Sequence, residues 1–138
     1  MFKRIDHVAL VVPDLDQAVD LYRESFGLEP VFRDRSEEQG FEVVGFQVGE
    51  AHIELLAPTR SDSVIAGFLE KRGPGLHHIG LEVEDLERCL DEIRAKGLRL
   101  TSETPRRGTG GSRIAFIHPK SLLGTMLELV EPPEERAE

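Results

Sequence analysis

Several residue types that would mark other classes of protein are scarce in this chain of 138 residues. It has one cysteine, no tryptophan and one tyrosine, and aromatic residues make up 6% of the sequence. The single cysteine, Cys89, excludes an internal disulfide framework and is typical of a reducing compartment. No stretch approaches the roughly 18 consecutive apolar residues that a membrane-spanning helix needs. The start of the chain has no signal-peptide pattern, so we expect a cytoplasmic protein.

Positive charge is also scarce, and the formal net charge is −9. Nucleic acids and anionic membranes would repel such a chain, so we expect neither as a partner. Acidic residues are absent, however, between Glu103 and Glu128, and basic residues gather there. They are Arg106, Arg107, Arg113, His118 and Lys120. This stretch is either a solvated basic edge or the place where a small anionic ligand binds.

The chain contains two related halves, because two short stretches of the first half recur in the second. One pair of stretches, offset by 71 residues, aligns residues 5–12 with residues 76–83. The other pair, offset by 74 residues, aligns residues 53–58 with residues 127–132. Two matches in the same order at nearly the same offset indicate an internal duplication.

Each half predicts the element order βαβββ. An apolar strand leads into an amphipathic helix, which Asp14 or Asp85 caps at its start and Gly27 or Gly97 ends. Three further strands follow, near 29–34, 41–48 and 51–57 in the first half and near 98–102, 112–118 and 125–130 in the second. We therefore expect an α+β fold of two tandem βαβββ modules, forming a curved, open, barrel-like sheet around a metal cleft.

The division of the chain follows from these elements. We expect one domain whose first module covers about residues 4–60 and whose second covers about 75–132. A connecting helix is expected within 61–74, where apolar residues recur at helical spacing. The glutamate-rich tail, 133–138, is expected to fray.

A histidine on the first strand and a glutamate on the last strand recur at equivalent places in both halves. These residues are His7, Glu54, His78 and Glu128. A lone strand histidine is more often a hydrogen-bonded core residue, and a lone strand glutamate is as often exposed. Their joint recurrence favours a shared metal site, since carboxylates between apolar neighbours need a partner when buried. Mixed nitrogen and oxygen ligands suit Co²⁺, Mn²⁺, Ni²⁺, Fe²⁺ or Zn²⁺.

Three stretches make the chain recognisable: Glu38-Gln39-Gly40, residues 68–79, and residues 108–121. With them the chain resembles the vicinal-oxygen-chelate superfamily and, within it, the methylmalonyl-CoA epimerases, over about residues 4–131. The most specific feature is the turn His118-Pro119-Lys120-Ser121. Other branches of the superfamily usually have an Asp-Pro-Asp-Gly turn at this place.

The resemblance implies an isomerase that interconverts (R)- and (S)-methylmalonyl-CoA by removing the C2 proton through a metal-stabilised enolate. It implies one divalent ion, for which we expect Co²⁺, bound by His7, Glu54, His78 and Glu128. It also implies a homodimer and a second role for Glu128 as an acid/base. Lys120 and Ser121, and after them Arg113 and Arg106, are expected to bind coenzyme A phosphates or the substrate carboxylate.

A second acid/base is needed on the opposite face of the substrate, and here the chain departs from its relatives. Some family members have a glutamate three residues after Gly40, where this chain has Val43. Glu42 is adjacent, but its side chain should point to the other face of a regular strand. Some members also have a glutamine where this chain has Glu54, so we expect Glu54 to be both a metal ligand and the second base.

Two other functions stay open at this stage. A glyoxalase I type lactoylglutathione lyase uses the same order of histidine and glutamate ligands. A non-catalytic small-molecule binding protein of the same superfamily would generally lack the complete ligand set. The turn at His118-Pro119-Lys120-Ser121 favours the CoA enzyme over both.

Overall fold

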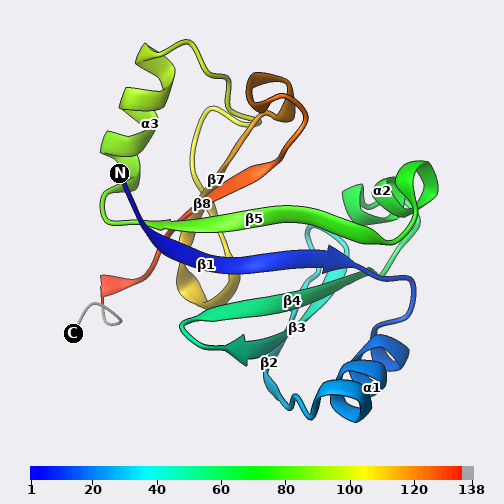
Figure 1. The fold of residues 1–138 in the computed structure, drawn as a ribbon. Helices are drawn as coiled ribbons and strands as arrows, with labels where there is room; N and C mark the ends of the chain where they lie inside the picture. The colour runs from blue at the N-terminus through cyan, green and yellow to red at the C-terminus, as the bar shows by residue number, and fades with distance from the viewer. Residues whose placement is uncertain (135–138) are drawn as a thin grey trace. The chain divides into compact units, whose positions relative to one another are not determined.

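The computed structural model describes residues 1–134, so residues 135–138 of the predicted frayed tail lie outside the described part (Figure 1). The chain divides into two compact units. The N-terminal unit is His7–His77, and the C-terminal unit comprises residues 1–6 and the described residues from His78 onward. Both units combine helices with strands, so the predicted α+β class is confirmed. Among the described residues, no helix has the length and hydropathy needed to cross a membrane.

The N-terminal unit contains a mixed sheet of four strands in the order β2-β3-β4-β1. Strands β1 and β4 are parallel, and the other neighbours are antiparallel. The elements are β1 (Phe2–Val11, whose first residues belong to the C-terminal unit), α1 (Leu15–Phe26), β2 (Pro30–Ser36), β3 (Phe41–Val48), β4 (Ala51–Pro58) and α2 (Val64–Arg72). The predicted βαβββ order and the connecting helix are therefore confirmed, with strand ends displaced by up to three residues.

The two faces of this sheet are covered by different elements, because side chains alternate between faces along each strand. One face packs against α1, which lies beside the sheet in Figure 1. The residues buried between α1 and this face are Leu15, Ala18, Val19, Val44, Phe46, Leu55 and Ala57. The other face carries Ala9, Val11, Val43 and Leu56, with Ile65 of α2. This second face also bears His7 and Glu54, since His7 lies two residues before Ala9 on β1 and Glu54 lies two residues before Leu56 on β4.

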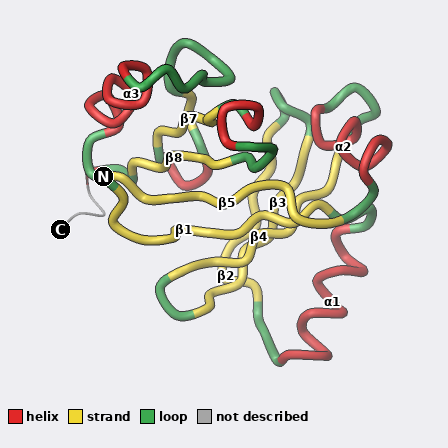
Figure 2. The backbone as a smooth tube through the Cα atoms, turned by 45° about the horizontal axis from the view of Figure 1, so that its top comes forward, coloured by secondary structure: helices red, strands yellow, loops and turns green. Residues whose placement is uncertain are grey.

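The C-terminal unit repeats the plan with shorter strands, in the order β5-β8-β7-β6. Its elements are β5 (Gly75–Val83, whose first residues belong to the N-terminal unit), α3 (Leu86–Ala95), β6 (Arg106–Arg107), β7 (Arg113–Ile117) and β8 (Leu127–Glu131), with 3-10 turns at Thr109–Gly111 and Pro119–Leu122. Helix α3 covers one face of β7 and β8 (Figure 2). Cys89 is buried in that interface, as predicted.

The helix boundaries follow the predicted signals. Asp14 accepts a hydrogen bond from the backbone N–H of Gln17 at 3.0 Å, and Asp85 accepts one from Arg88 at 3.1 Å. Both aspartates therefore act as N-caps. Gly27 ends α1 in the left-handed region, at φ 67°, where a residue with a Cβ atom would be strained.

The predicted strand at 98–102 is wrong. Leu100 pairs there through an isolated antiparallel bridge to Ile117, with backbone hydrogen bonds between Thr101 and Phe116 and between His118 and Arg99. The regular strand β6 lies later, at Arg106–Arg107. Apolar residues occur at alternate positions, Leu98 and Leu100, because both side chains pack against the buried cluster between α3 and the sheet. The backbone N–H of Arg99 instead donates to the Ser121 hydroxyl at 3.0 Å. The apolar alternation therefore marks a segment that packs against a helix and pairs with β7 through a single bridge, and not a regular strand.

Candidate active site

In the N-terminal unit, His7 and Glu54 lie on adjacent parallel strands. Glu54 is paired in register with Ala9, two residues after His7, so both side chains rise from the same face. Nδ1 of His7 lies 3.7 Å from Oε2 of Glu54. The two residues are buried, at 5% and 8% exposure. The Glu54 carboxylate is thus buried, although its sequence neighbours Ile53 and Leu55 pack on the opposite face of β4, against α1.

The C-terminal unit contains an equivalent pair, His78 and Glu128. Glu128 is paired in register with Gly80, again two residues after the histidine. Nε2 of His78 lies 3.7 Å from Oε1 of Glu128, and the residues are 7% and 6% exposed. The same register, separation and burial in both units agree with the internal duplication seen in the sequence.

Each histidine–carboxylate pair fits a divalent metal. The separation of 3.7 Å is too long for a hydrogen bond. Two ligand atoms on one ion, with bonds of about 2.0–2.2 Å, lie at most about 4.4 Å apart. These residues also belong to buried groups whose nitrogen and oxygen atoms could hold an ion. Each pair therefore offers nitrogen and oxygen donors that are compatible with a borderline divalent ion.

Another buried carboxylate is accounted for without a metal. Glu82 on β5 is 7% exposed and accepts a hydrogen bond from the Arg4 guanidinium at 3.1 Å. Lys3 lies 4.0 Å from the same carboxylate. Glu82 is therefore a charge paired with cations from β1 and is not a candidate ligand.

The structure separates Glu42 from Val43 as the sequence predicted. The Glu42 carboxylate pairs with Arg35 at 2.9 Å and with Arg33 at 3.6 Å, on the α1 side of the sheet. Val43 points to the other face and packs beside Ala9. Glu42 is thus directed away from the face that carries Glu54.

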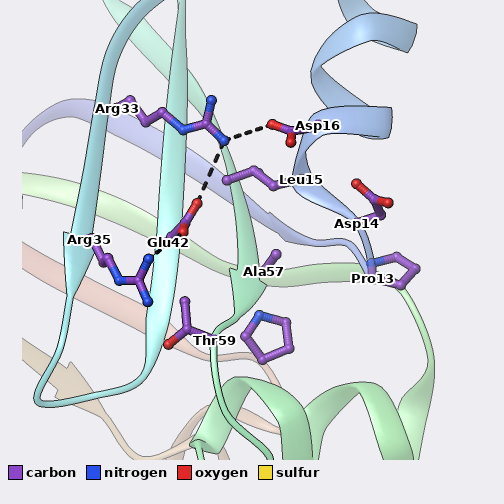
Figure 3. A pocket seen from close by; sticks show the side chains of 10 residues that line it. Pro13, Asp14, Leu15, Asp16, Arg33, Arg35, Glu42, Ala57 and Thr59 are labelled. Atoms are coloured by element: carbon purple, nitrogen blue, oxygen red, sulfur yellow. Dashed lines mark hydrogen bonds and ion pairs between the residues drawn. The ribbon is translucent and has the colours of Figure 1, made fainter.

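A hollow of about 370 Å³ in the N-terminal unit lies on the α1 side (Figure 3). Half of its lining residues are charged and already have partners, and none of the predicted ligands lines it. Arg33 donates to Asp16 at 2.9 Å, and this hydrogen bond raises the pKa of the Arg33 guanidinium. The hollow therefore does not coincide with the histidine–glutamate chemistry.

The residues predicted to bind coenzyme A lie on two elements. Lys120 and Ser121 belong to the 3-10 turn Pro119–Leu122, and the backbone N–H of Lys120 donates to Nδ1 of His118 at 3.1 Å. Arg106 is exposed on β6. Arg113 on β7 is already paired with Glu87 and, at 3.2 Å, with Glu131. Its hydrogen bond with Glu87 raises the pKa of the Arg113 guanidinium, and this pairing would compete with a phosphate.

Two histidines outside the predicted ligand set are held by aromatic rings. His52 on β4 is paired in register with His7, and its ring meets that of Phe32 edge to face, with centroids 5.7 Å apart. His77 contacts Phe68 of α2 at 4.9 Å. The contact of His52 with Phe32 had no counterpart in the sequence analysis. The signal that could have suggested it is Gly45, since a glycine inside a strand often marks a close approach.

The fold and these pairs define a class of proteins. The sequence matches the Glyoxalase/Bleomycin resistance protein/Dioxygenase superfamily over residues 6–116. It is 40% identical over 131 residues to the ethylmalonyl-CoA/methylmalonyl-CoA epimerase of Cereibacter sphaeroides, covering 94% of this chain and 98% of that one. The chain therefore belongs to this superfamily and, within it, to the methylmalonyl-CoA epimerase family.

Solved structures agree with this assignment. The methylmalonyl-CoA epimerase of Mycobacterium tuberculosis superposes with a TM-score of 0.93 and 42% identity, over 99% of this chain and 92% of that one. A variant of the Streptomyces coelicolor methylmalonyl-CoA epimerase, in complex with 2-nitronate-propionyl-CoA, superposes with a TM-score of 0.92 and 38% identity. The match covers 96% of this chain and 99% of that one. The resemblance drawn from the sequence is confirmed by these comparisons.

Proposed function

We propose that this protein is an epimerase that interconverts (R)- and (S)-methylmalonyl-CoA. The observation that carries this proposal is the duplicated pair of a buried histidine and a buried glutamate 3.7 Å apart, in a chain of the epimerase family. His7, Glu54, His78 and Glu128 would together hold one divalent ion, Co²⁺ in our proposal. When bound, the ion supplies Lewis-acid stabilisation to the oxygen on which negative charge develops.

The two glutamates would carry the proton. One carboxylate takes the C2 proton, and the electrons of the C–H bond move toward the thioester oxygen. The carboxyl group on the opposite side then returns a proton to the other face of C2, and the thioester is restored with inverted configuration. Burial of Glu54 and Glu128 supports these roles, because a carboxyl group shielded from bulk water can exchange a proton with C2 without exchanging it with solvent at the same time.

Binding of the CoA portion would involve Lys120 and Ser121 first and Arg113 and Arg106 second. Lys120 supports this role because its side chain is exposed in the turn that precedes the Glu128 strand. Arg113 would have to exchange one of its carboxylate partners for a phosphate. A homodimer is also part of the proposal, and analytical ultracentrifugation of the purified chain would test it directly.

Activity measurements distinguish this proposal from its main rival. Pure (S)-methylmalonyl-CoA should be converted to the equilibrium mixture of both epimers by the metal-loaded protein, and Glu128→Gln should slow this conversion at least about 100-fold. Methylglyoxal with glutathione should not be consumed. Turnover of the hemithioacetal without epimerisation would instead establish the lactoylglutathione lyase.

A further inference from the structure

An aromatic ring at the edge of the N-terminal sheet reaches over a glycine toward Glu54. Phe32 on β2 is paired in register with Gly45 on β3, and Gly45 is paired with Glu54 on β4. Paired residues of adjacent strands lie on the same face of a sheet. The side chains of Phe32 and Glu54 therefore rise from one face, and the residue between them has no side chain.

Gly45 provides the space that this ring occupies. A Cβ atom at Gly45 would lie 1.9 Å from Cε2 and 2.3 Å from Cζ of Phe32. The ring thus lies directly over the backbone of β3 and leans from β2 toward β4. The ring also meets the His52 ring of β4 edge to face, with centroids 5.7 Å apart, so this contact too places the Phe32 ring toward β4. His52 precedes Glu54 by two residues and shares its face of β4.

The C-terminal unit places a phenyl ring beside its own pair in another way. Phe116 on β7 is paired in register with Glu128, at the position equivalent to Gly45. Its ring meets the His78 ring edge to face at 5.1 Å. In both units a phenyl ring therefore lies on the same sheet face as the buried carboxylate and contacts a histidine of that face, although the residues at the equivalent strand position differ. In the N-terminal unit, where the residue paired with Glu54 is Gly45, the ring on this face comes from Phe32 of the next strand.

We infer that Phe32, seated over Gly45, limits the size of the C2 substituent that the site accepts next to Glu54. This inference rests on the proposed epimerase function, because a C2 atom that exchanges its proton with Glu54 brings its substituent beside that carboxylate. The ring cannot retreat toward β3, since its edge already occupies the position of a Cβ atom there. A smaller side chain at position 32 therefore leaves room for a longer substituent.

The test compares methylmalonyl-CoA with ethylmalonyl-CoA, which differ by one methylene group. In Phe32→Leu, the ratio of kcat/KM for ethylmalonyl-CoA to that for methylmalonyl-CoA should rise about tenfold, the lower end of what one methylene contributes to discrimination. The matched control is Phe46→Leu, since Phe46 lies on the α1 face of the same sheet and stacks on Tyr22. This control should lose stability without a change in the ratio.

A second readout does not depend on turnover. The affinity for butyryl-CoA relative to propionyl-CoA, measured by calorimetry, should shift in Phe32→Leu in the same direction as the kinetic ratio. Gly45→Ala, which must displace the ring, should also change both ratios. Ratios that stay within twofold of the wild type in Phe32→Leu and Gly45→Ala overturn the inference while leaving an active epimerase. A wild-type protein that epimerises neither substrate overturns the proposed function and the inference with it.

Discussion

Oε2 of Glu54 lies 3.7 Å from Nδ1 of His7, across two parallel strands whose register places Glu54 opposite Ala9. The pair of Glu128 and His78 repeats this separation and register. A carboxylate oxygen and an imidazole nitrogen buried 3.7 Å apart are close enough to bind one ion together.

The first prediction concerns metal content. The wild-type protein should bind one equivalent of divalent metal per chain, and His78→Ala should weaken binding by more than about 100-fold, because loss of a ligand exceeds the effect of an outer-shell partner. Metal titration followed by elemental analysis measures both quantities. His77→Ala is the matched control on the same strand, since His77 contacts Phe68, and it should bind like the wild type. Equal affinities for all three proteins would count against the proposed site.

The second prediction separates the two roles of Glu54. Glu54→Gln keeps an oxygen ligand but removes the group that accepts a proton. Metal affinity should fall by no more than about tenfold, whereas epimerisation should slow about 10²–10⁴-fold, the usual contribution of a general acid or base. Metal titration and the rate of epimerisation measure the two effects. Full activity in this variant would show that another residue serves the second face of the substrate.

The histidine and glutamate pairs could be predicted because duplication is visible in sequence. A single histidine such as His7 says little, but its recurrence as His78, with Glu54 recurring as Glu128, carries information that does not depend on knowing the fold. The helix caps at Asp14 and Asp85 were equally accessible, since capping is a local interaction between a side chain and nearby backbone N–H groups.

Other features depend on contacts that the sequence pattern does not specify. The alternation of Leu98 and Leu100 looked like a strand but reflects packing against α3. The position of the Phe32 ring over Gly45 depends on the pairing register of β2 and β3, which shifts between Pro30 and Phe32. The glycine could signal a close approach, but only the register identifies the ring that approaches.

The third prediction tests the duplicated helix starts. Asp14→Ala and Asp85→Ala should each lower the free energy of unfolding by about 0.5–2 kcal/mol, because each removes one capping hydrogen bond of about 3 Å. Urea unfolding followed by circular dichroism measures the change. Asp20→Ala, on the exposed side of α1 and paired with Arg23, should cost less than about 1 kcal/mol. A cap variant as stable as the wild type would refute the assigned N-cap.

The fourth prediction concerns Cys89. Burial, and after it the charge of Glu92, raises the pKa of the Cys89 thiol. Below the unfolded pKa of about 8.5 the thiol is neutral in both states, and its contribution to stability is complete. As the pH rises further, the unfolded chain ionises first, so this contribution is lost through the folded pKa. The stability difference between wild type and Cys89→Ala should therefore shrink from pH 7.5 to pH 10 in urea unfolding. A difference that is constant over this range would contradict the assignment.

Proton exchange at C2 of methylmalonyl-CoA in deuterated water tests the central claim most directly. Proton NMR should show loss of the C2 proton signal with the metal-loaded protein, collapse of the methyl doublet as deuterium enters, and no exchange above the uncatalysed rate after a chelator removes the ion. Glu128→Gln should behave like the chelated protein. If the loaded wild-type protein leaves the C2 proton in place, or if the chelator has no effect, the metal-dependent epimerase is the wrong account of this molecule.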